Sequence, residues 1–263
     1  MSQITAANDA PGRVASFIDG SIVRSEASTI ATLTHSMNVH FGDWNDADFG
    51  QVCVGHQQTS NDAVYQVCKR CMDIVISLSA IVLLFPVIII AAALIRICSR
   101  GPVLFTQIRV GKGGKTFRCF KFRSMVPNAE SLKQDLLKAN QHGDPRTFKI
   151  EDDPRITPLG RILRKSSIDE LPQILNVLMG QMSIVGPRPP LPCEVEMYST
   201  SDFQRLSVKP GLTCIWQISG RSRLPFSAQV KLDLEYIRTR GLAKDVAIIL
   251  RTIPVVLSGD GAA

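Results

Sequence analysis

One uncharged stretch constrains this chain more than any other feature of its 263 residues. Residues 74–95 form a run of 22 positions without a charged side chain, and Ser77 and Ser79 are its only polar members. As a helix, this run would be about 33 Å long, which is enough to cross the hydrocarbon core of a bilayer. Helices buried in soluble proteins rarely continue this far without a charge, so we expect a membrane-inserted helix.

The residues within and beside this run leave two topologies open. Pro86, near its middle, removes a backbone donor and kinks a helix. Basic residues flank the run on both sides, with Lys69 and Arg70 before it and Arg96 and Arg100 after it. A spanning helix is expected to have a positive bias on one side only, whereas basic residues on both flanks suit a kinked, re-entrant hairpin. A single span with a tolerated proline fits the same pattern equally well.

Charge divides the chain into unlike parts. Residues 1–62 contain two basic and seven acidic residues, although the net charge of the whole chain is +7. This segment is rich in Ser, Thr, Asn, Asp and Gly and has no sustained apolar periodicity, so we expect a disordered acidic tail. The pattern then predicts a membrane-inserted hydrophobic helix over 63–100 and a folded domain over 101–263.

A block of positive charge follows the apolar run. No acidic residue occurs between Asp73 and Glu130, and eight basic residues lie there: Arg96, Arg100, Arg109, Lys112, Lys115, Arg118, Lys121 and Arg123. Such a patch predicts either a surface for anionic lipid or a site for a polyanionic substrate. We assign this charge to a membrane surface and to phosphate groups, not to nucleic acid.

The periodicity of the remaining residues predicts an α+β fold. Strand patterns at 103–110 and 116–122 flank a Gly-rich turn, which indicates a small β-hairpin. The turn ends in Gly-Gly-Lys-Thr, but it lacks the earlier Gly and the following helix of a P-loop. Apolar spacing predicts helices, several of them amphipathic, at 129–140, 162–165, 171–178, 227–240 and 243–257, and a β-rich segment at 208–219.

Two adjacent acids, Asp169 and Glu170, stand where one of these helices begins. Capping alone is one interpretation, because Ser167 and Glu170 have the spacing of a capping box and acids near a helix N-terminus favour the dipole. Pro172 restricts the pair to the first turn, where its missing donor does no harm. With Arg164 five residues earlier, a carboxylate here is also kept ionised, as a nucleophile or metal ligand must be.

The acid pair, the cations and the apolar run together fit phosphoryl transfer, where positioning and charge neutralisation supply the catalysis. Mg²⁺ is typically held in such sites by one or two carboxylates plus substrate phosphates. A second rigid element, Gly-Pro-Arg-Pro-Pro at 186–190, fixes the backbone around Arg188. Arginine suits bidentate contact with phosphate, although a plain turn is the alternative.

Six motifs occur in a consistent order over residues 65–260. They are Lys-Arg-x-x-Asp at 69–73, Lys-Phe-Arg-Ser-Met at 121–125, Asp-Pro-Arg-Ile-Thr-Pro-Leu-Gly at 153–160, Ser-Ile-Asp-Glu-Leu-Pro-Gln at 167–173, Ser-Ile-Val-Gly-Pro-Arg-Pro at 183–189 and Lys-Pro-Gly-Leu-Thr at 209–213. In these motifs the chain resembles the bacterial sugar transferases, the monotopic phosphoglycosyl transferases that initiate exopolysaccharide assembly. Ordered agreement of six motifs is more specific than any one of them.

The resemblance implies both a location and a reaction. It implies a re-entrant helix kinked at Pro86, which inserts a monotopic protein into the bacterial inner (cytoplasmic) membrane, with residues 101–263 as a catalytic domain facing the cytoplasm. The implied reaction moves hexose-1-phosphate from a UDP-sugar to polyprenyl (undecaprenyl) phosphate. Its products are polyprenyl-diphosphate-sugar and UMP, and downstream glycosyltransferases would extend the lipid-linked sugar.

The resemblance also implies roles for individual residues. Asp169 would be the nucleophile that attacks the β-phosphate and forms a covalent intermediate, and Glu170 would hold Mg²⁺. Four cations would bind substrate phosphates: Lys121, Arg123, Arg164 and Arg188. A hypothesis of another class is a non-catalytic, membrane-anchored polybasic adaptor that binds acidic lipids or partners, but an adaptor has no use for the acid pair in this setting. Glucose and galactose both remain open as the transferred hexose.

Overall fold

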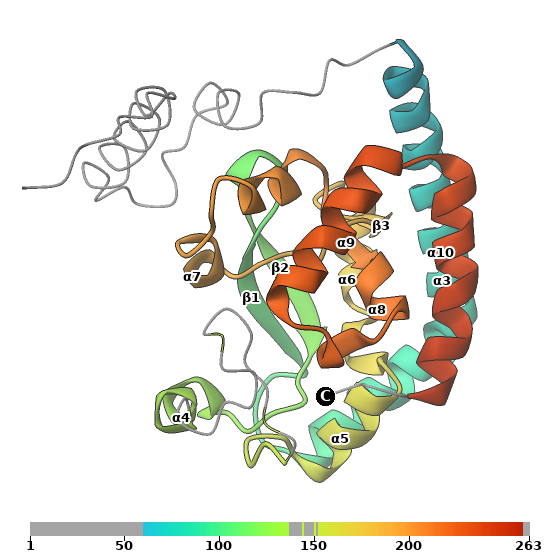
Figure 1. Cartoon of the computed structure of the whole chain (residues 1–263). Helices are drawn as coiled ribbons and strands as arrows, with labels where there is room; N and C mark the ends of the chain where they lie inside the picture. Colours follow the sequence, from blue (N-terminus) through green and yellow to red (C-terminus); the bar gives the residue numbers. More distant parts are fainter. Residues whose placement is uncertain (1–59, 137–143, 145–149, 151, 260–263) are drawn as a thin grey trace, which may run out of the picture. The chain divides into compact units, whose positions relative to one another are not determined.

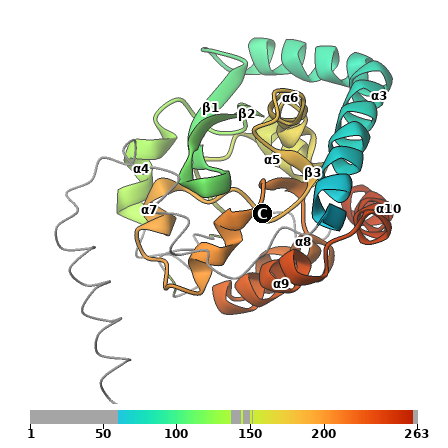
Figure 2. The ribbon, with the colours of Figure 1, turned by 90° about the horizontal axis from the view of Figure 1, so that it is seen from above.

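The computed structural model of the chain describes residues 60–136, 144, 150 and 152–259. The predicted acidic tail lies outside these residues, apart from its last three positions. A 39-residue helix, α3 (Ser60–Cys98), opens the described part and contains the whole uncharged run. Among the described residues it is the one helix long and apolar enough to cross a membrane. Pro86 lies inside it, and Figure 2 shows α3 bending sharply part-way along its length. The long apolar helix is thus confirmed.

The predicted hairpin is confirmed as well. Strands β1 (Leu104–Val110) and β2 (Thr116–Phe122) pair antiparallel along their whole length. A 3₁₀ turn, η1 (Lys112–Gly114), joins them, and Gly113 within it has φ 65°, which a glycine adopts without strain. The chain continues as strand after Thr116, where a P-loop would require a helix.

Two short helices follow the hairpin, namely α4 (Ala129–Leu136) and α5 (Pro158–Lys165). The end predicted for the first of them, at 140, lies outside the described residues. The second begins four residues before its predicted start. Thr157 explains this difference, because its hydroxyl accepts a hydrogen bond of 3.0 Å from Gly160 N, and a proline is favourable at the first helical position.

The helix predicted to begin at the acid pair is divided in the structure. Both acids lie in a 3₁₀ turn, η3 (Ile168–Glu170), and Pro172 separates this turn from α6 (Gln173–Leu178). The predicted capping box is wrong. Ser167 has φ 56° and makes no side-chain capping bond, because a capping residue needs an extended backbone and this one is left-handed. Gly180, with φ 79°, follows α6 as predicted.

A short parallel pair, β3 (Ser183–Val185) and β4 (Gly211–Thr213), brings two of the sequence motifs together. The β-rich segment predicted at 208–219 is therefore only partly right, since the chain turns into α8 (Ile215–Ile218) directly after β4. The first and last residues of α8 both pack on the core, and a helical turn places residues three apart on one face. The remaining short elements are α7 (Pro192–Val195), η4 (Asp202–Ser207) and η5 (Arg221–Arg223).

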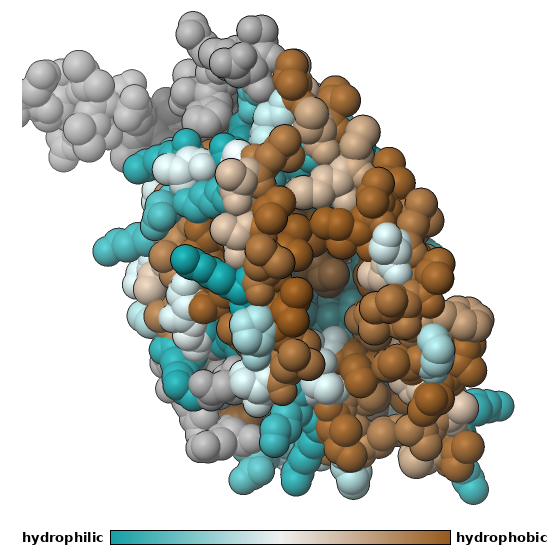
Figure 3. Space-filling model, turned by 90° about the vertical axis from the view of Figure 1, so that its right-hand side faces the viewer, coloured by the Kyte–Doolittle hydropathy of each residue, from teal (hydrophilic) through white to brown (hydrophobic). Residues whose placement is uncertain are grey.

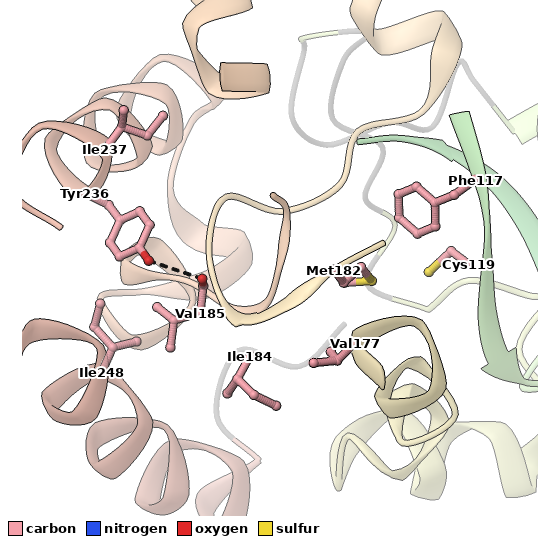
Figure 4. Close-up of a cluster of buried hydrophobic side chains, with 9 residues drawn as sticks. All are labelled: Phe117, Cys119, Val177, Met182, Ile184, Val185, Tyr236, Ile237 and Ile248. Atoms are coloured by element: carbon pink, nitrogen blue, oxygen red, sulfur yellow. Dashed lines mark hydrogen bonds between the residues drawn. The ribbon is translucent and has the colours of Figure 1, made fainter. Parts of the chain in front are cut away.

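The two predicted C-terminal helices, α9 (Phe226–Thr239) and α10 (Leu242–Ser258), are confirmed, and α10 runs beside α3 (Figure 1). The main core joins β2, α6, β3, α9 and α10 through nine buried side chains, shown in Figure 4: Phe117, Cys119, Val177, Met182, Ile184, Val185, Tyr236, Ile237 and Ile248. The Tyr236 hydroxyl donates a hydrogen bond of 3.2 Å to the main-chain oxygen of Val185. One core therefore fixes both the hairpin and the helix that follows the acids.

The first turns of α3 are attached to this core by the Lys-Arg-x-x-Asp motif. Arg70 donates hydrogen bonds of 2.6 and 2.7 Å to the main-chain oxygens of Val177 and Leu178. A cation at this position caps carbonyls at the end of α6 and favours its dipole. Asp73 is 2% exposed and accepts a hydrogen bond of 2.9 Å from Ile184 N. The motif thus fixes the place where the apolar helix leaves the domain.

Large apolar side chains remain exposed along α3 and α10. On α10 they recur every three or four residues, which forms one stripe along the helix: Leu242, Val246, Leu250, Ile253 and Leu257. Figure 3 shows apolar residues gathered on the side of the molecule where these two helices lie. Exposed apolar surface of this extent marks an interaction surface, and beside a helix of this length it supports association with a membrane.

Candidate active site

The acid pair meets the hairpin through one short ion pair. Lys121, near the end of β2, places its Nζ 2.6 Å from Oε1 of Glu170 in η3. The two side chains are 22% and 30% exposed, so both are accessible from solvent. A charge-assisted hydrogen bond of this length fixes the carboxylate where a substrate can reach it.

Glu170 and Lys121 line a pocket that we call the acid-pair pocket. Its residues come from both strands of the hairpin, from η3, and from four segments further along the chain: Arg109, Cys119, Lys121, Glu170, Gln173, Arg188, Pro189, Gly211, Leu212 and Gln217. Three cations and one carboxylate stand among them. A concave, positively charged surface of this kind raises the local concentration of anions, so the pocket suits a phosphate-bearing ligand.

Arg109 is the pocket residue that sequence reasoning missed, since it was only one of eight cations in the basic block. It is 5% exposed, and its Nη1 donates a hydrogen bond of 2.9 Å to the main-chain oxygen of Pro189. Its Nε has no hydrogen-bond partner among the described residues. The signal that could have found it is the hairpin register. Arg109 lies opposite Phe117 in the hairpin, and paired residues project from the same face. Cys119 and Lys121 follow Phe117 at intervals of two residues, so Arg109, Cys119 and Lys121 share that face.

Arg188 lies in the Gly-Pro-Arg-Pro-Pro segment and is exposed at the edge of the pocket. The segment is held on both sides of this residue. Before it, the main-chain oxygen of Pro187 accepts a hydrogen bond of 2.8 Å from Gly211 N. After it, Pro189 accepts the hydrogen bond from Arg109, and the main-chain oxygen of Pro190 accepts one of 2.9 Å from Val110 N. The predicted rigid presentation of Arg188 therefore rests on the hairpin as well as on the prolines.

Asp169 is the more enclosed acid of the pair, with 6% of its surface exposed. Burial raises its pKa above the usual range, and the negative charge of Glu170 raises it further, whereas Lys121 and Arg164 oppose this shift. For Glu170, burial also acts to raise the pKa, but Lys121 and Arg188 outweigh it and the pKa falls below its usual value. At neutral pH Glu170 is therefore firmly ionised, while Asp169 holds its proton to a higher pH.

The two other predicted phosphate-binding cations do not line the acid-pair pocket. Arg164, on α5, lies close enough to interact electrostatically with Asp169 and Glu170, and burial lowers its pKa. Arg123 is 8% exposed and donates hydrogen bonds to Ser99, at 2.9 Å to its main-chain oxygen and 2.6 Å to its hydroxyl. Arg123 thus lies against the segment that follows α3.

The residues of the pocket fit a hard divalent cation only with help from a ligand. The described residues contain no cluster of three or more His, Cys, Asp or Glu side chains that could hold a metal ion. The one carboxylate that lines the pocket, Glu170, is ionised and partly exposed. Mg²⁺ keeps several waters and takes few protein carboxylates when substrate phosphates supply the other oxygens, so this donor set suits the ion in that form.

Gly211 lines the acid-pair pocket and lets its strand lie close to the backbone of Gly186, two residues before Arg188. Its replacement should disturb the site. A Cβ atom at this position would lie 2.0 Å from Gly186 N, which is backbone and cannot rotate away. We expect Gly211→Ala to separate β3 from β4, lower stability by about 2–4 kcal/mol and displace Arg188. Thermal unfolding and ligand affinity would measure the two effects. Gly241→Ala is the matched control, because no atom lies within 4 Å of its Cβ position. Equal stability of the two variants would contradict the prediction.

A carboxylate pair beside three pocket cations, on a domain that carries a long apolar helix, defines a membrane-associated site for phosphate chemistry. The family model for the bacterial sugar transferases matches residues 64–259. The chain belongs to this family, as the six ordered motifs predicted.

Individual relatives agree with this assignment. The galactosyl transferase CpsE of Streptococcus agalactiae is 48% identical over 197 residues, which are 74% of this chain and 43% of that protein. The exopolysaccharide production protein ExoY of Sinorhizobium fredii is 38% identical over 198 residues, 74% of this chain and 88% of ExoY. The undecaprenyl-phosphate galactose phosphotransferase of Salmonella typhimurium is 42% identical over 201 residues, 74% of this chain and 41% of that enzyme. The chain thus spans less than half of two of these relatives and most of ExoY.

Proposed function

We propose that this protein is a phosphoglycosyl transferase that moves hexose-1-phosphate from a UDP-sugar to polyprenyl phosphate. The observation that carries the proposal is the Glu170–Lys121 ion pair, which stands next to Asp169 in a pocket with two further cations. The printed name of the Salmonella relative, an undecaprenyl-phosphate galactose phosphotransferase, supports the same reaction class. The name of ExoY supports a place in exopolysaccharide production, where this transfer would be the first committed step.

In the proposed first step, a carboxylate oxygen of Asp169 attacks the β-phosphorus of the UDP-sugar. The bond between that phosphorus and the oxygen bridging to the α-phosphate breaks, and UMP leaves with the bridging oxygen. Lys121, Arg109 and Arg188 neutralise charge on the phosphates, because they are the cations that line the pocket. Glu170 would hold Mg²⁺, which screens phosphate charge when bound.

In the proposed second step, a phosphate oxygen of the lipid attacks the same phosphorus and displaces Asp169. This restores the free carboxylate and forms polyprenyl-diphosphate-sugar. Splitting one transfer into two displacements is the usual advantage of a covalent intermediate, and it implies ping-pong kinetics. The apolar surface of α3 and α10 would keep the site at the bilayer, where the lipid phosphate is found.

The alternative, a polybasic adaptor without chemistry, explains the apolar helix and the basic block equally well. It gives no reason for two adjacent carboxylates with opposite pKa shifts beside an ordered lysine. Environments that separate the pKa values of neighbouring groups are typical of catalytic sites. Family membership points the same way.

Turnover tests the proposal directly. Purified full-length protein in lipid nanodiscs would be incubated with Mg²⁺, polyprenyl phosphate and either UDP-galactose or UDP-glucose, and UMP release would be measured. We expect release with at least one donor, and galactose is the first choice because two of the relatives named above carry it in their names. No release with any UDP-hexose or UDP-N-acetylhexosamine, from protein that binds anionic vesicles normally, would favour the adaptor.

The pKa shifts predict how the rate depends on pH. The nucleophile must be ionised, so turnover should fall as the pH decreases through the raised pKa of Asp169. This limb should lie above the range of an unperturbed aspartate, about 3.9. Lys121 lowers the pKa of Asp169, so Lys121→Gln should move the limb to higher pH in addition to slowing the reaction. A pH–rate profile of both proteins measures the shift, and a limb that stays in place would remove Asp169 as the titrating group.

The re-entrant topology is part of the proposal, with both ends of α3 on the cytoplasmic face and the kink at Pro86 in the bilayer. Its support is the internal proline, the sharp bend of α3 and the basic residues on both flanks. A cysteine introduced near residue 50 and another at Lys231 on α9 should be labelled by membrane-permeant maleimide alone in intact cells. Labelling of the first by an impermeant reagent would show that the helix spans the membrane.

A further inference from the structure

A second pocket lies at the far end of α6 from the acid pair. The acids precede this helix, whereas the second pocket is formed where α6 ends and α3 begins. Its volume is about 50 Å³, and it shares no lining residue with the acid-pair pocket. Six of its lining residues are charged, five of them basic: Lys69, Arg70, Asp73, Lys112, Lys209 and Arg240.

Two of the five basic residues are neutralised by carboxylates. Lys69 Nζ lies 2.9 Å from Oδ2 of Asp245, and Arg240 Nη2 lies 3.0 Å from Oδ1 of Asp62. These pairs connect the first turns of α3 to α10 and to the end of α9. Asp245 and Asp62 therefore neutralise Lys69 and Arg240, and the charges of Arg70, Lys112 and Lys209 remain.

Arg70, Lys112 and Lys209 form no ion pair with a carboxylate among the described residues. Arg70 donates its hydrogen bonds to main-chain oxygens, which carry no net charge. Asp73 is the single acid in the lining, and it already accepts hydrogen bonds from Ser183 and Ile184. The second pocket therefore carries a surplus of positive charge.

Two of these cations are also held close together. Arg70 Nη2 and Lys209 Nζ each lie 3.6 Å from the point where a Cβ atom on Gly180 would stand. Burial lowers the pKa of Lys209, and the positive charges of Arg70 and Lys112 lower it further, while Asp73 opposes them. Like charges gathered without a counter-charge destabilise a fold, and an anion bound among them removes that cost.

The size of the second pocket limits what the anion can be. A cavity of about 50 Å³ has room for a single phosphate group among these side chains. The pocket also adjoins the point where the charged motif of α3 ends and the uncharged run begins, immediately after Asp73. Basic pockets at such boundaries bind the head groups of anionic lipids.

We propose that the second pocket is a phosphate-binding site distinct from the acid-pair pocket, in which Lys209, Lys112 and Arg70 hold one phosphate group. The shared chemistry is a phosphate ester or free phosphate, and its source is either an anionic phospholipid at the bilayer surface or soluble phosphate. The proposal does not depend on the transfer reaction, because none of the three cations lines the acid-pair pocket.

Amine acylation followed by mass spectrometry would test the proposal at individual lysines. Full-length protein in neutral detergent would be acylated with and without inorganic phosphate. Lys209 and Lys112 should react about tenfold more slowly at a phosphate concentration ten times the Kd. Lys231, exposed on α9 and outside both pockets, is the internal control and should react at an unchanged rate. Lys121 reports separately on the acid-pair pocket.

A variant and two kinds of vesicle complete the test. Lys112→Gln, which changes an exposed residue of η1, should weaken the protection of Lys209 by phosphate, whereas the matched Lys231→Gln should leave it unchanged. Without phosphate, protection of Lys209 in phosphatidylglycerol vesicles but not in phosphatidylcholine vesicles identifies a lipid head group as the source. Protection by inorganic phosphate alone identifies a soluble anion. Equal acylation of Lys209 under all of these conditions would overturn the proposal.

Discussion

Asp169→Asn should reduce UMP release by on the order of 10⁴-fold or more, because it removes the proposed nucleophile and leaves the side-chain volume nearly unchanged. Asn cannot form the acyl phosphate. The substitution also removes the Asp169 carboxyl group, whose pKa the site raises. The variant should still bind UDP-sugar, since the three cations that line the acid-pair pocket, Arg109, Lys121 and Arg188, are unchanged. Radiolabelled donor should accordingly label the wild-type protein covalently and leave the variant unlabelled.

Two controls separate loss of chemistry from loss of structure. Asp152→Asn changes an exposed acid in the loop before α5 and should keep wild-type turnover. Binding of Asp169→Asn to anionic vesicles should equal that of the wild-type protein, because the apolar surface of α3 and α10 is untouched. Turnover of Asp169→Asn at the wild-type rate would mean that another group is the nucleophile.

Asp245→Ala should produce the largest loss of stability, about 3–5 kcal/mol. Asp245 is fully buried and accepts hydrogen bonds from Lys69 at 2.9 Å, Tyr65 at 2.9 Å and Tyr236 at 2.8 Å. Its removal leaves the Lys69 ammonium, 14% exposed, without its carboxylate and the Tyr65 hydroxyl without an acceptor, while the Tyr236 hydroxyl keeps only the longer hydrogen bond to Val185. Thermal unfolding in detergent would measure the loss, and proteolysis near residue 65 should accelerate because α3 is released from α10.

The matched control uses an ion pair at the surface. Glu235→Ala removes the carboxylate that faces Lys244 at 3.5 Å, and the Glu235 side chain is 58% exposed. Exposed pairs of this kind contribute about 0–1 kcal/mol. If both variants unfold at the same temperature, the buried cluster around Asp245 does not hold α3 in place.

Much of the fold follows from local sequence because its signals are local. The uncharged run, the strand–turn–strand pattern and the apolar spacing of α9 and α10 each act over fewer than about 25 residues, and the structure contains all of them. The segment 208–219 was harder, because its conformation after β4 depends on how Ile215 and Ile218 pack on a core built from distant strands and helices. Tertiary packing, which the sequence pattern does not contain, decided that region.

Some residues of the candidate site could be predicted from the sequence, and others could not. The acid pair and Arg188 could be singled out because rigid neighbours, Pro172 and the prolines of 186–190, restrict their backbone. Arg109 could not be separated from the other cations without the hairpin register, which places it opposite Phe117. Arg123 was singled out by its position in a motif, but the motif does not predict that Ser99 accepts its hydrogen bonds, because that contact depends on tertiary structure.

The hydrogen bonds that Arg70 donates to the end of α6 connect the apolar helix α3 to the helix that follows the acid pair. This helix has only six residues, with carbonyls held from α3 at one end and the acid pair immediately before the other. Arg70 thus links the first turns of α3 directly to the helix that follows the acids. Loss of these two hydrogen bonds would therefore remove both an attachment of the apolar helix and a support of the helix that follows the acids, because one arginine side chain provides both.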